Sequence, residues 1–456
     1  TLPGIAGILL TIGMAVDANV IIYERIREEL REGKTLLMSI KDGFQNSYSA
    51  IIDANVTTIL VAFVLSYFGL GPIKGFAVVL IIGVIFSLFT AVLVGRLMID
   101  YWTIDRGKEI GFWTGFSRNA FANIDFNWLG NRRLAYIISG SIIVLGFGSF
   151  FVRGFDLGVD FKGGYSYNVQ FEQGLDIDPD DLRTGLAEVF GSTPTVKEVS
   201  TNNTFNIVTD YLINSTEEDV ATQVQDKLFE GVNAIVGGNL KKSSFKNTKS
   251  SSTHITSSTK VGPTIADDIA WSSFYAATFA LLLIFFYIFV RFSKWQYSMG
   301  AVAALFHDVL VVLSIFSIFW GILPFSLEID QAFIAAVLTV IGYSINDTVV
   351  VFDRIREYLH RYTSKMSKQE VLTKAINSTF SRTVITSLTT LFVVLVLFLF
   401  GGTSIKGFAF ALVVGVIVGT YSSVFIATPV MSDQIGELEV KAPKKKSYSR
   451  AAKANR

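Results

Sequence analysis

The chain has 456 residues, of which 51% are hydrophobic and 17% charged, and its mean hydropathy is +0.48. A soluble domain of this length rarely carries so much apolar sequence, so the composition predicts several membrane spans. The formal net charge of +1 gives no general attraction to nucleic acid, and the lack of cysteine excludes disulfides, thiolate metal sites and cysteine nucleophiles.

Nine apolar runs are each long enough to cross a bilayer, for which about 20 residues are needed. They are Leu2–Tyr23, Ala50–Leu70, Ile73–Ile99, Leu134–Val152, Ile269–Val290, Tyr297–Ile322, Gln331–Phe352, Val384–Phe400 and Gly407–Val430. The first run has no basic segment before it and no cleavage site after it, which excludes a signal peptide. We therefore expect a polytopic α-helical membrane protein with about nine transmembrane helices, in a chain that begins partway through a longer protein.

Lysine and arginine are concentrated in the loops on one side of these spans, and only Lys74 and Lys406 lie in the short loops opposite. Basic loops mark the cytoplasmic side. The C-terminal tail, residues 433–456, is basic and belongs to this side. Residues 153–268 are then expected on the outer, periplasmic side.

That outer region is the one predicted soluble domain. Strand-like alternation and amphipathic helical periodicity occur in the order strand, helix, strand, strand, helix, at Tyr165–Phe171, Asp178–Phe190, Thr195–Ser200, Thr204–Tyr211 and Thr216–Ile235. This order predicts a small α+β sandwich. We interpret the Ser/Thr/Lys-rich stretch Ser243–Lys260 as a loop or ragged strand, with a solvated linker as the favoured interpretation.

The chain also repeats itself, since residues 13–28 align with 342–357 and Ile73–Ala77 with Ile405–Ala409. Matched spans run in the same direction, which predicts parallel repeats related by an axis along the membrane normal. By symmetry, three further spans and a soluble domain are expected before the first half. The predicted units are three spans (1–100), a cytoplasmic linker (101–133), one span (134–152), the soluble domain (153–268), five spans (269–432) and the tail.

Ionisable residues inside the spans are the main candidate functional residues. Asp17 and Asp347 lie at nearly the same depth in matched spans, Asp53 lies near the start of the second span, and Arg382 opens the eighth. A charge at the bilayer centre costs at least about 3 kcal/mol, so such residues face a protein interior or a wet cavity. Carboxylates balanced between burial and a nearby arginine can bind and release a proton. We predict a proton relay of these four residues, with a structural ion pair as the alternative.

Polar neighbours extend this prediction. Thr383 and Ser387 continue one face of the Arg382 helix, where their hydroxyls would hold water or orient the acids, with helix packing as the alternative. Asn346 aligns with Asp17 in the repeat. The dipeptide His307-Asp308 is expected at the cytoplasmic start of its span, in a structural role. No phosphate loop or metal motif is present, so protons are the only coupling ion predicted and no cofactor is expected.

Several segments resemble SecDF, the fused SecD–SecF protein-export family of the resistance-nodulation-division superfamily. The SecD-like segments are residues 13–19, 24–28 and 53–55, and the SecF-like ones are 157–164, 261–263, 304–309, 344–357 and 381–383. The family implies a protein of the bacterial cytoplasmic (inner) membrane that works with the SecYEG channel, the SecA motor and preproteins, and with YajC- or YidC-type membrane proteins. It also implies use of the proton-motive force, with proton-path residues at Asp17, Asp347 and Arg382, and a ferredoxin-like fold for the soluble domain.

Two other functions are compatible with intramembrane acids in a repeated bundle. One is a related proton-driven exporter of small molecules or lipids, and the other is a scaffold for the translocon that transduces no energy. The Sec-type motifs and the single small outer domain favour a subunit of protein export, which is a transport component and not an enzyme.

Overall fold

The computed structural model describes residues 2–69, 72–113, 125–200, 203–215, 217, 219–248, 250, 252–323, 325–362, 366–402 and 405–435. Within these residues, nine helices are long and apolar enough to cross a membrane, which confirms the predicted fold class. They are α1 (Leu2–Arg31), α2 (Leu36–Phe68), α3 (Pro72–Phe89) with its continuation through α4 (Gly95–Asp100), α5 (Arg132–Arg153), α10 (Pro263–Phe292), α11 (Trp295–Phe319), α12 (Gln331–Tyr362), α13 (Lys368–Phe400) and α14 (Lys406–Ser422), which continues into α15 (Thr428–Gln434). The predicted basic tail beyond residue 435 and part of the predicted linker lie outside the described residues.

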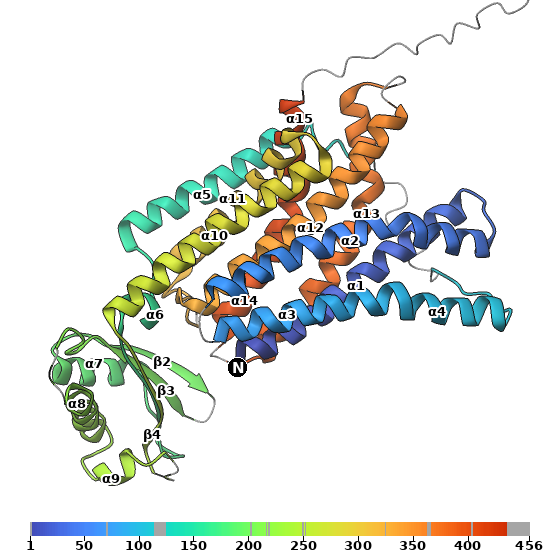
Figure 1. Ribbon diagram of the computed structural model, residues 1–456. Helices are drawn as coiled ribbons and strands as arrows, with labels where there is room; N and C mark the ends of the chain where they lie inside the picture. Colours follow the sequence, from blue (N-terminus) through green and yellow to red (C-terminus); the bar gives the residue numbers. More distant parts are fainter. Residues whose placement is uncertain are drawn as a thin grey trace, which may run out of the picture.

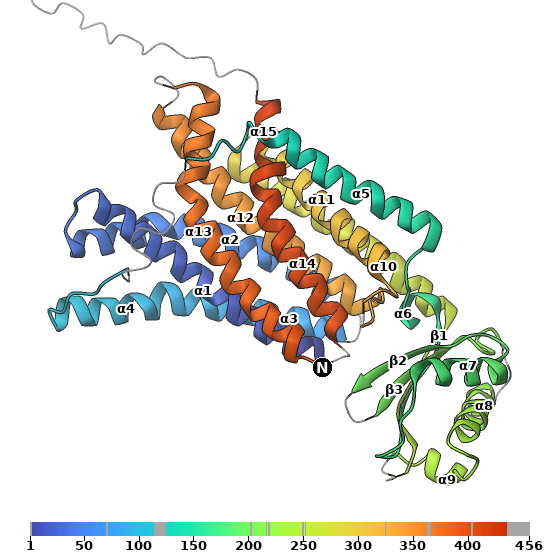
Figure 2. The same ribbon diagram turned by 180° about the vertical axis from the view of Figure 1, so that it is seen from behind.

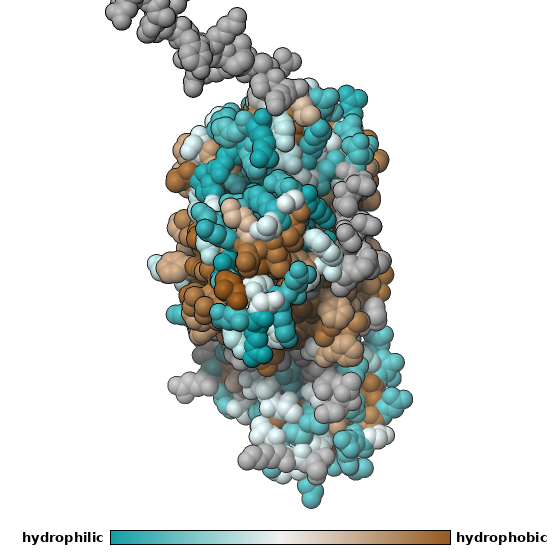
Figure 3. Space-filling view, turned by 90° about the vertical axis from the view of Figure 1, so that its right-hand side faces the viewer, coloured by the Kyte–Doolittle hydropathy of each residue, from teal (hydrophilic) through white to brown (hydrophobic). Residues whose placement is uncertain are grey.

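The helices form one slanted bundle, with the soluble domain at one end and α15 at the other (Figure 1). Helix α12 is the most buried of the nine, whereas α5 and α10 are mostly exposed at the side of the bundle. Large apolar side chains such as Phe86, Phe151 and Val290 are more than 60% exposed. Figure 3 shows most of the apolar surface in the middle of the molecule, between a hydrophilic upper end and the soluble domain. A surface of this kind suits a lipid environment.

The two repeats pack against each other in equivalent ways. Glycines let the backbones approach closely at both contacts: a Cβ added to Gly13 of α1 would lie 3.5 Å from the Cβ of Val393 on α13, and one added to Gly342 of α12 would lie 3.4 Å from the Cβ of Val61 on α2. In the sequence alignment Gly13 corresponds to Gly342 and Val61 to Val393. Figure 2 shows α1, α13, α12 and α2 side by side in the centre of the bundle. These four helices therefore make the central part of the interface between the repeats.

The charged sequence beside some of the predicted spans is helical and continuous with them. Helix α13 begins sixteen residues before the predicted span, because Ser367 and Glu370 form a capping box: the Glu370 amide donates to the Ser367 hydroxyl (3.3 Å) and the Ser367 amide donates to the Glu370 carboxylate (2.9 Å). This arrangement satisfies backbone donors that would otherwise be unpaired. Helix α13 therefore extends beyond its apolar run, and the interface between the repeats extends with it.

The soluble domain contains a four-stranded antiparallel sheet in the order β2-β3-β1-β4. Its elements are β1 (Gly164–Gln170), α7 (Pro179–Phe190), β2 (Thr195–Ser200), β3 (Thr204–Thr209), α8 (Val220–Ile235) and β4 (His254–Val261), with the short α9 (Lys242–Phe245) before the last strand. Helices α7 and α8 cover one face of the sheet in Figure 1, around a core that includes Val169, Leu186 and Leu228. This β-α-β-β-α-β topology is that of a ferredoxin-like fold.

One interpretation of this region was wrong. The stretch Ser243–Lys260, for which a solvated linker was favoured, contains most of α9 and most of the edge strand β4, which pairs with β1 from Gly164↔Val261 to Gln170↔His254. The middle of the strand, Ser257–Lys260, is exposed, so its serine and threonine side chains face solvent. An exposed edge strand tolerates polar residues on its open face, which hides the strand pattern in the sequence.

A joint of polar contacts connects the soluble domain to the N-terminal end of α12. Backbone hydrogen bonds join the Ile329 amide to the Asp156 carbonyl (2.7 Å) and the Gly158 amide to the Ile329 carbonyl (2.8 Å). Lys197 of β2 forms ion pairs with Glu328 and, at 3.3 Å, with Asp156. These contacts tie the domain to the loop that leads into α12.

The same joint supplies acceptors to the first turn of α12. The Asp160 carboxylate accepts from the Gln331 amide (3.1 Å), and the Asp330 carboxylate accepts from the Phe333 amide (2.7 Å). These amides belong to the set that a helix leaves without an internal partner at its N-terminus. A movement of the domain would therefore act directly on this helix.

Candidate functional site

The candidate site lies at the interface between the repeats. Asp17 of α1, Asp347 of α12 and Arg382 of α13 are close enough to interact electrostatically. Asp17 and Asp347 are only 5% and 6% exposed, so neither carboxylate is hydrated by bulk solvent. Helix α1 packs closely on α13 at Gly13, about one helical turn before Asp17. Three of the four residues predicted for a relay therefore form one cluster, in which the two acids are buried and Arg382 is partly exposed.

Hydroxyl and amide groups surround the two carboxylates. The Ser387 hydroxyl contacts Asp347 (3.3 Å) and also Thr420 of α14 (2.6 Å). Among the described residues, Asp17 Oδ1, Asn346 Oδ1 and Thr383 Oγ1 are buried without a hydrogen-bond partner. Buried polar atoms normally have partners, so orphaned oxygens in a membrane protein are a feature that needs explanation.

A small cavity explains part of this. Its volume is about 20 Å³, and its lining includes Asp17 and Asn346 together with Asn55 and Thr58 of α2. That volume is enough for about one water molecule. The polar lining suits such a water, which would serve both Asp17 and Asn346.

A larger polar cavity of about 310 Å³ opens beside the cluster, toward the end of the bundle opposite the soluble domain. We call it the vestibule. It is lined by both repeats, including Glu24, Arg25, Glu28, Arg31, Asn46, Ser47, Asp353, Arg354, Glu357, Asn377, Ser378, Ser381 and Arg382. Because Arg382 contributes to its wall, the vestibule extends from the buried cluster toward the polar end of the molecule.

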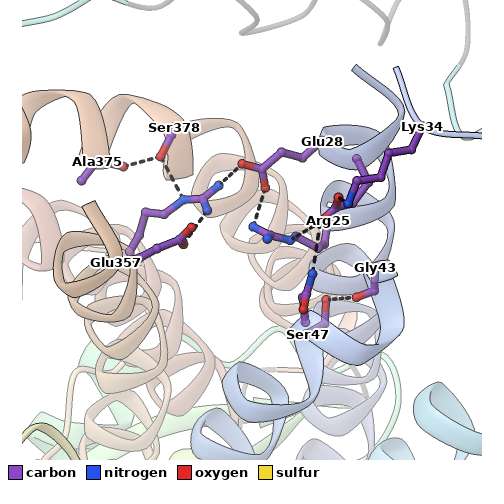
Figure 4. Close-up of polar contacts among 11 residues, drawn as sticks. Arg25, Glu28, Lys34, Gly43, Ser47, Glu357, Ala375 and Ser378 are labelled. Carbon is purple, nitrogen blue, oxygen red and sulfur yellow. Dashed lines mark hydrogen bonds and ion pairs between the residues drawn. The ribbon is translucent and has the colours of Figure 1, made fainter. Parts of the chain in front are cut away.

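An ion pair between the repeats lies at the wall of the vestibule. Figure 4 shows Glu28 between Arg25 of its own helix (2.9 Å) and the guanidinium group that also reaches Glu357 and Ser378. That guanidinium belongs to Arg354, which pairs with Glu28 across the interface. Arg354 corresponds to Arg25 in the sequence repeat, so equivalent arginines hold the same glutamate.

Asp53, the fourth predicted relay residue, lies in another set of contacts. Its carboxylate accepts from Arg291 (2.6 Å) and from the Tyr287 hydroxyl (3.0 Å), both on α10. These bonds fasten α2 to α10. The structure does not bring Asp53 together with the buried cluster.

Sequence reasoning placed the His307-Asp308 pair wrongly, at the start of its span. The two residues lie near the middle of α11, at positions 13 and 14 of 25, and Asp308 is completely buried. At 1.5 Å per residue they lie about 18 Å from the beginning of the helix. Because α11 begins at Trp295, the twelve residues from Trp295 to His307 already place the pair well inside the span.

Comparison with known proteins identifies the family. The family described as "Protein export membrane protein SecD/SecF, C-terminal" matches residues 1–104 and 240–436, and the "SecD/SecF GG Motif" matches residues 148–174. The chain belongs to the SecD/SecF protein-export family. The GG-motif match covers the end of α5, the residues Asp156 to Asp160 that form one side of the joint, and β1.

Named relatives of this SecD/SecF chain are similar over most of its length. The SecF subunit of Rhodothermus marinus is 44% identical over 68% of this chain and 94% of its own length. The SecDF subunit of Brucella abortus is 34% identical over 94% of this chain and 53% of its own. The crystal structure of SecDF from Thermus thermophilus matches with a TM-score of 0.78 and 34% identity, over 94% of this chain and 54% of that one. The chain thus spans about half the length of its fused SecDF relatives.

Proposed function

We propose that this membrane-embedded chain uses the proton-motive force to promote preprotein translocation, as part of an accessory subunit of the Sec translocase. The proposal places it in the bacterial cytoplasmic membrane, with residues 153–268 in the periplasm and the C-terminus in the cytoplasm. Its partners would be the SecYEG channel, SecA and preproteins, with YajC- or YidC-type proteins beside them. The family membership supports the role in export, and the buried acids support the coupling to protons.

The observation that carries the coupling is the charge count of the cluster. Two carboxylates face one arginine in a region of low dielectric. With both acids ionised, the cluster carries a net negative charge, which costs free energy because like charges repel and burial opposes ionisation. With one proton bound, the cluster is neutral. A site of this kind alternates between the two states by taking up and releasing one proton, and the titration belongs to the pair rather than to either acid.

The surroundings provide a way for the proton to leave. Asp17 lines the water-sized cavity, and Arg382 lines the vestibule, so both cavities adjoin the cluster. One proton driven through about 100 mV yields about 2.3 kcal/mol, enough to bias two arrangements of the repeats. Since α12 carries Asp347 and is tied to the soluble domain at its outer end, a change at the cluster would reach the domain through this helix.

The test is Asp347→Asn in the full-length protein, reconstituted with the export machinery in lipid vesicles. We expect loss of proton flux and of the stimulation of export by the gradient, with normal expression. Asp180→Asn, at an exposed carboxylate on α7, is the matched control and should behave like the wild type. Export that is still stimulated by the gradient in the Asp347 variant would contradict the proposal and favour a scaffold that transduces no energy.

A further inference from the structure

A second buried acid lies outside the cluster just described. The Asp308 carboxylate is completely buried. It accepts hydrogen bonds from the Ser344 hydroxyl of α12 (2.6 Å) and the Ser422 hydroxyl of α14 (2.9 Å), and Nδ1 of His307 lies within hydrogen-bond distance of it (3.0 Å). When Asp308 is ionised, its carboxylate can only accept hydrogen bonds, so Nδ1 then carries the proton and donates.

That role leaves one nitrogen of the imidazole without a partner. His307 Nε2 is buried and has no hydrogen-bond partner among the described residues. When the ring is neutral, Nε2 is an acceptor beside an ionised, buried aspartate, and the pair has a net negative charge. A proton on Nε2 makes the pair neutral, with an imidazolium bonded to a carboxylate. Burial favours the neutral pair, so Nε2 is the atom at which a proton would bind and leave.

Helix α14 connects this pair to the first cluster. Two residues on it face opposite ways: Thr420 contacts Ser387, which contacts Asp347, while Ser422 donates to Asp308. Gly419 packs so closely on α12 that an added Cβ would lie 2.8 Å from the Cβ of Ser344. A shift of α14 would therefore alter the hydrogen bonds of both acids together.

The backbone of α14 is irregular at this point. A π-helical turn, Ser423–Ala427, follows Ser422 directly. The matching helix of the first repeat has its π-helical turn at Thr90–Val94, which corresponds to residues 422–426 in the alignment. Such turns are rare and occur mostly at functional sites. Its presence in both repeats shows that it belongs to the architecture of the repeat, and it places an adaptable segment beside Asp308.

We propose that His307 and Asp308 form a second proton-binding site, coupled to Asp347 through α14. The titratable group that faces the pair from another helix is Tyr421, whose ring centroid is 6.0 Å from that of His307. Its hydroxyl donates to the Ala135 carbonyl (2.9 Å) and contacts Ser139 of α5 (3.1 Å), near Tyr136. Helix α12 contributes Ser344 and no charged group to these contacts within the described residues. The coupling rests on the proposed function, whereas proton binding by the pair does not.

Nitrogen NMR of labelled histidine in the full-length protein in lipid tests the site directly, because the protonation state of the imidazole determines the shifts of its two nitrogens. His307→Gln assigns the resonance. We expect His307 to exchange one proton between pH 5 and 9 in the wild type, and to stay neutral over this range in Asp308→Asn, which lacks the countercharge. A His307 that keeps one protonation state throughout in the wild type would overturn the proposal.

Coupling is tested with Asp347→Asn and with Ser422→Ala. The first should change the ratio of protonated to neutral His307 at a fixed pH by about fivefold, the lower end of typical coupling between sites. Ser422→Ala in the same background should reduce this effect. An unchanged ratio in Asp347→Asn overturns the coupling. If proton flux is lost in Asp347→Asn but His307 of the wild type does not titrate, only this second site is refuted. If flux is intact in Asp347→Asn and His307 titrates, only the proposed function is refuted.

Discussion

Replacement of Asp330 by asparagine should remove a pH dependence from the joint between the soluble domain and α12. Burial is the main cause that raises the pKa of Asp330 from 3.8 to about 7; the nearby acids Glu328 and Asp160 act in the same direction, against the hydrogen bond from the Phe333 amide and the charge of Lys197. Burial raises the pKa of Asp160 as well. If the joint opens, Asp330 becomes hydrated and regains its ordinary pKa.

The sign and size of the effect follow from that difference. The closed joint holds a proton that the open joint releases, so closure is most favourable below about pH 4 and weakens as the pH rises to about 7. The difference of about three units between the two pKa values corresponds to about 4 kcal/mol in the free energy of closing the joint. Because Asp330 is only half-buried, solvent screening reduces this to about 1–3 kcal/mol. The asparagine introduced by Asp330→Asn cannot ionise, but its side-chain oxygen still accepts from the Phe333 amide, since asparagine is a good N-cap residue.

Hydrogen exchange at the Ile329 and Gly158 amides measures the opening, since both donate across the joint. At pH 8 we expect exchange about 5- to 160-fold slower in Asp330→Asn than in the wild type, and at pH 5 a much smaller difference. Comparison at equal pH removes the intrinsic pH dependence of exchange. Faster exchange in the variant at pH 8 would refute the reasoning, because it would show an ionised Asp330 that stabilises the helix N-terminus.

Three further predictions concern contacts between parts of the molecule. Lys197→Met should destabilise the closed joint by about 1 kcal/mol, measured by hydrogen exchange at the same amides, and Lys197→Arg should retain most of the stability. Equal destabilisation in both variants would exclude an ion-pair role. Gly415→Ala should lower the free energy of unfolding by about 1–3 kcal/mol, since the added Cβ would lie 2.0 Å from a side-chain carbon of Val340. Gly148→Ala, at a glycine with open space around it, should have no such effect. Equal effects of the two substitutions on thermal unfolding would contradict the packing. Arg354→Met should weaken the contact between repeats by about 1–3 kcal/mol, seen as lower thermal stability, and an unchanged melting temperature would show that its pair with Glu28 contributes nothing.

Much of the membrane architecture could be predicted from the sequence because membrane spans have a strong signal. Long apolar runs gave the number of helices, and the alignment of Gly13 with Gly342 indicated which helices correspond. The ends of helices were less predictable. The charged start of α13 is helical because of the capping box at Ser367 and Glu370, a local signal that hydropathy does not detect.

The candidate site was only partly predictable. Asp17, Asp347 and Arg382 stood out because charges in apolar runs are costly, and the structure brings them together. Asp53 is also a charged residue in an apolar run, yet it forms an ion pair with Arg291, which is 238 residues away in the chain. His307 and Asp308 depend on serines from two other helices, a long-range arrangement that no spacing along the chain encodes.

The central claim is that the acids between the repeats change protonation as a proton gradient changes. Infrared difference spectroscopy of the full-length protein in lipid vesicles tests it most directly, because a protonated carboxyl has its own carbonyl band. We predict a band that responds to the imposed gradient in the wild type and is lost in Asp347→Asn or Asp17→Asn. Spectra of the wild type that stay the same under every gradient would contradict the account.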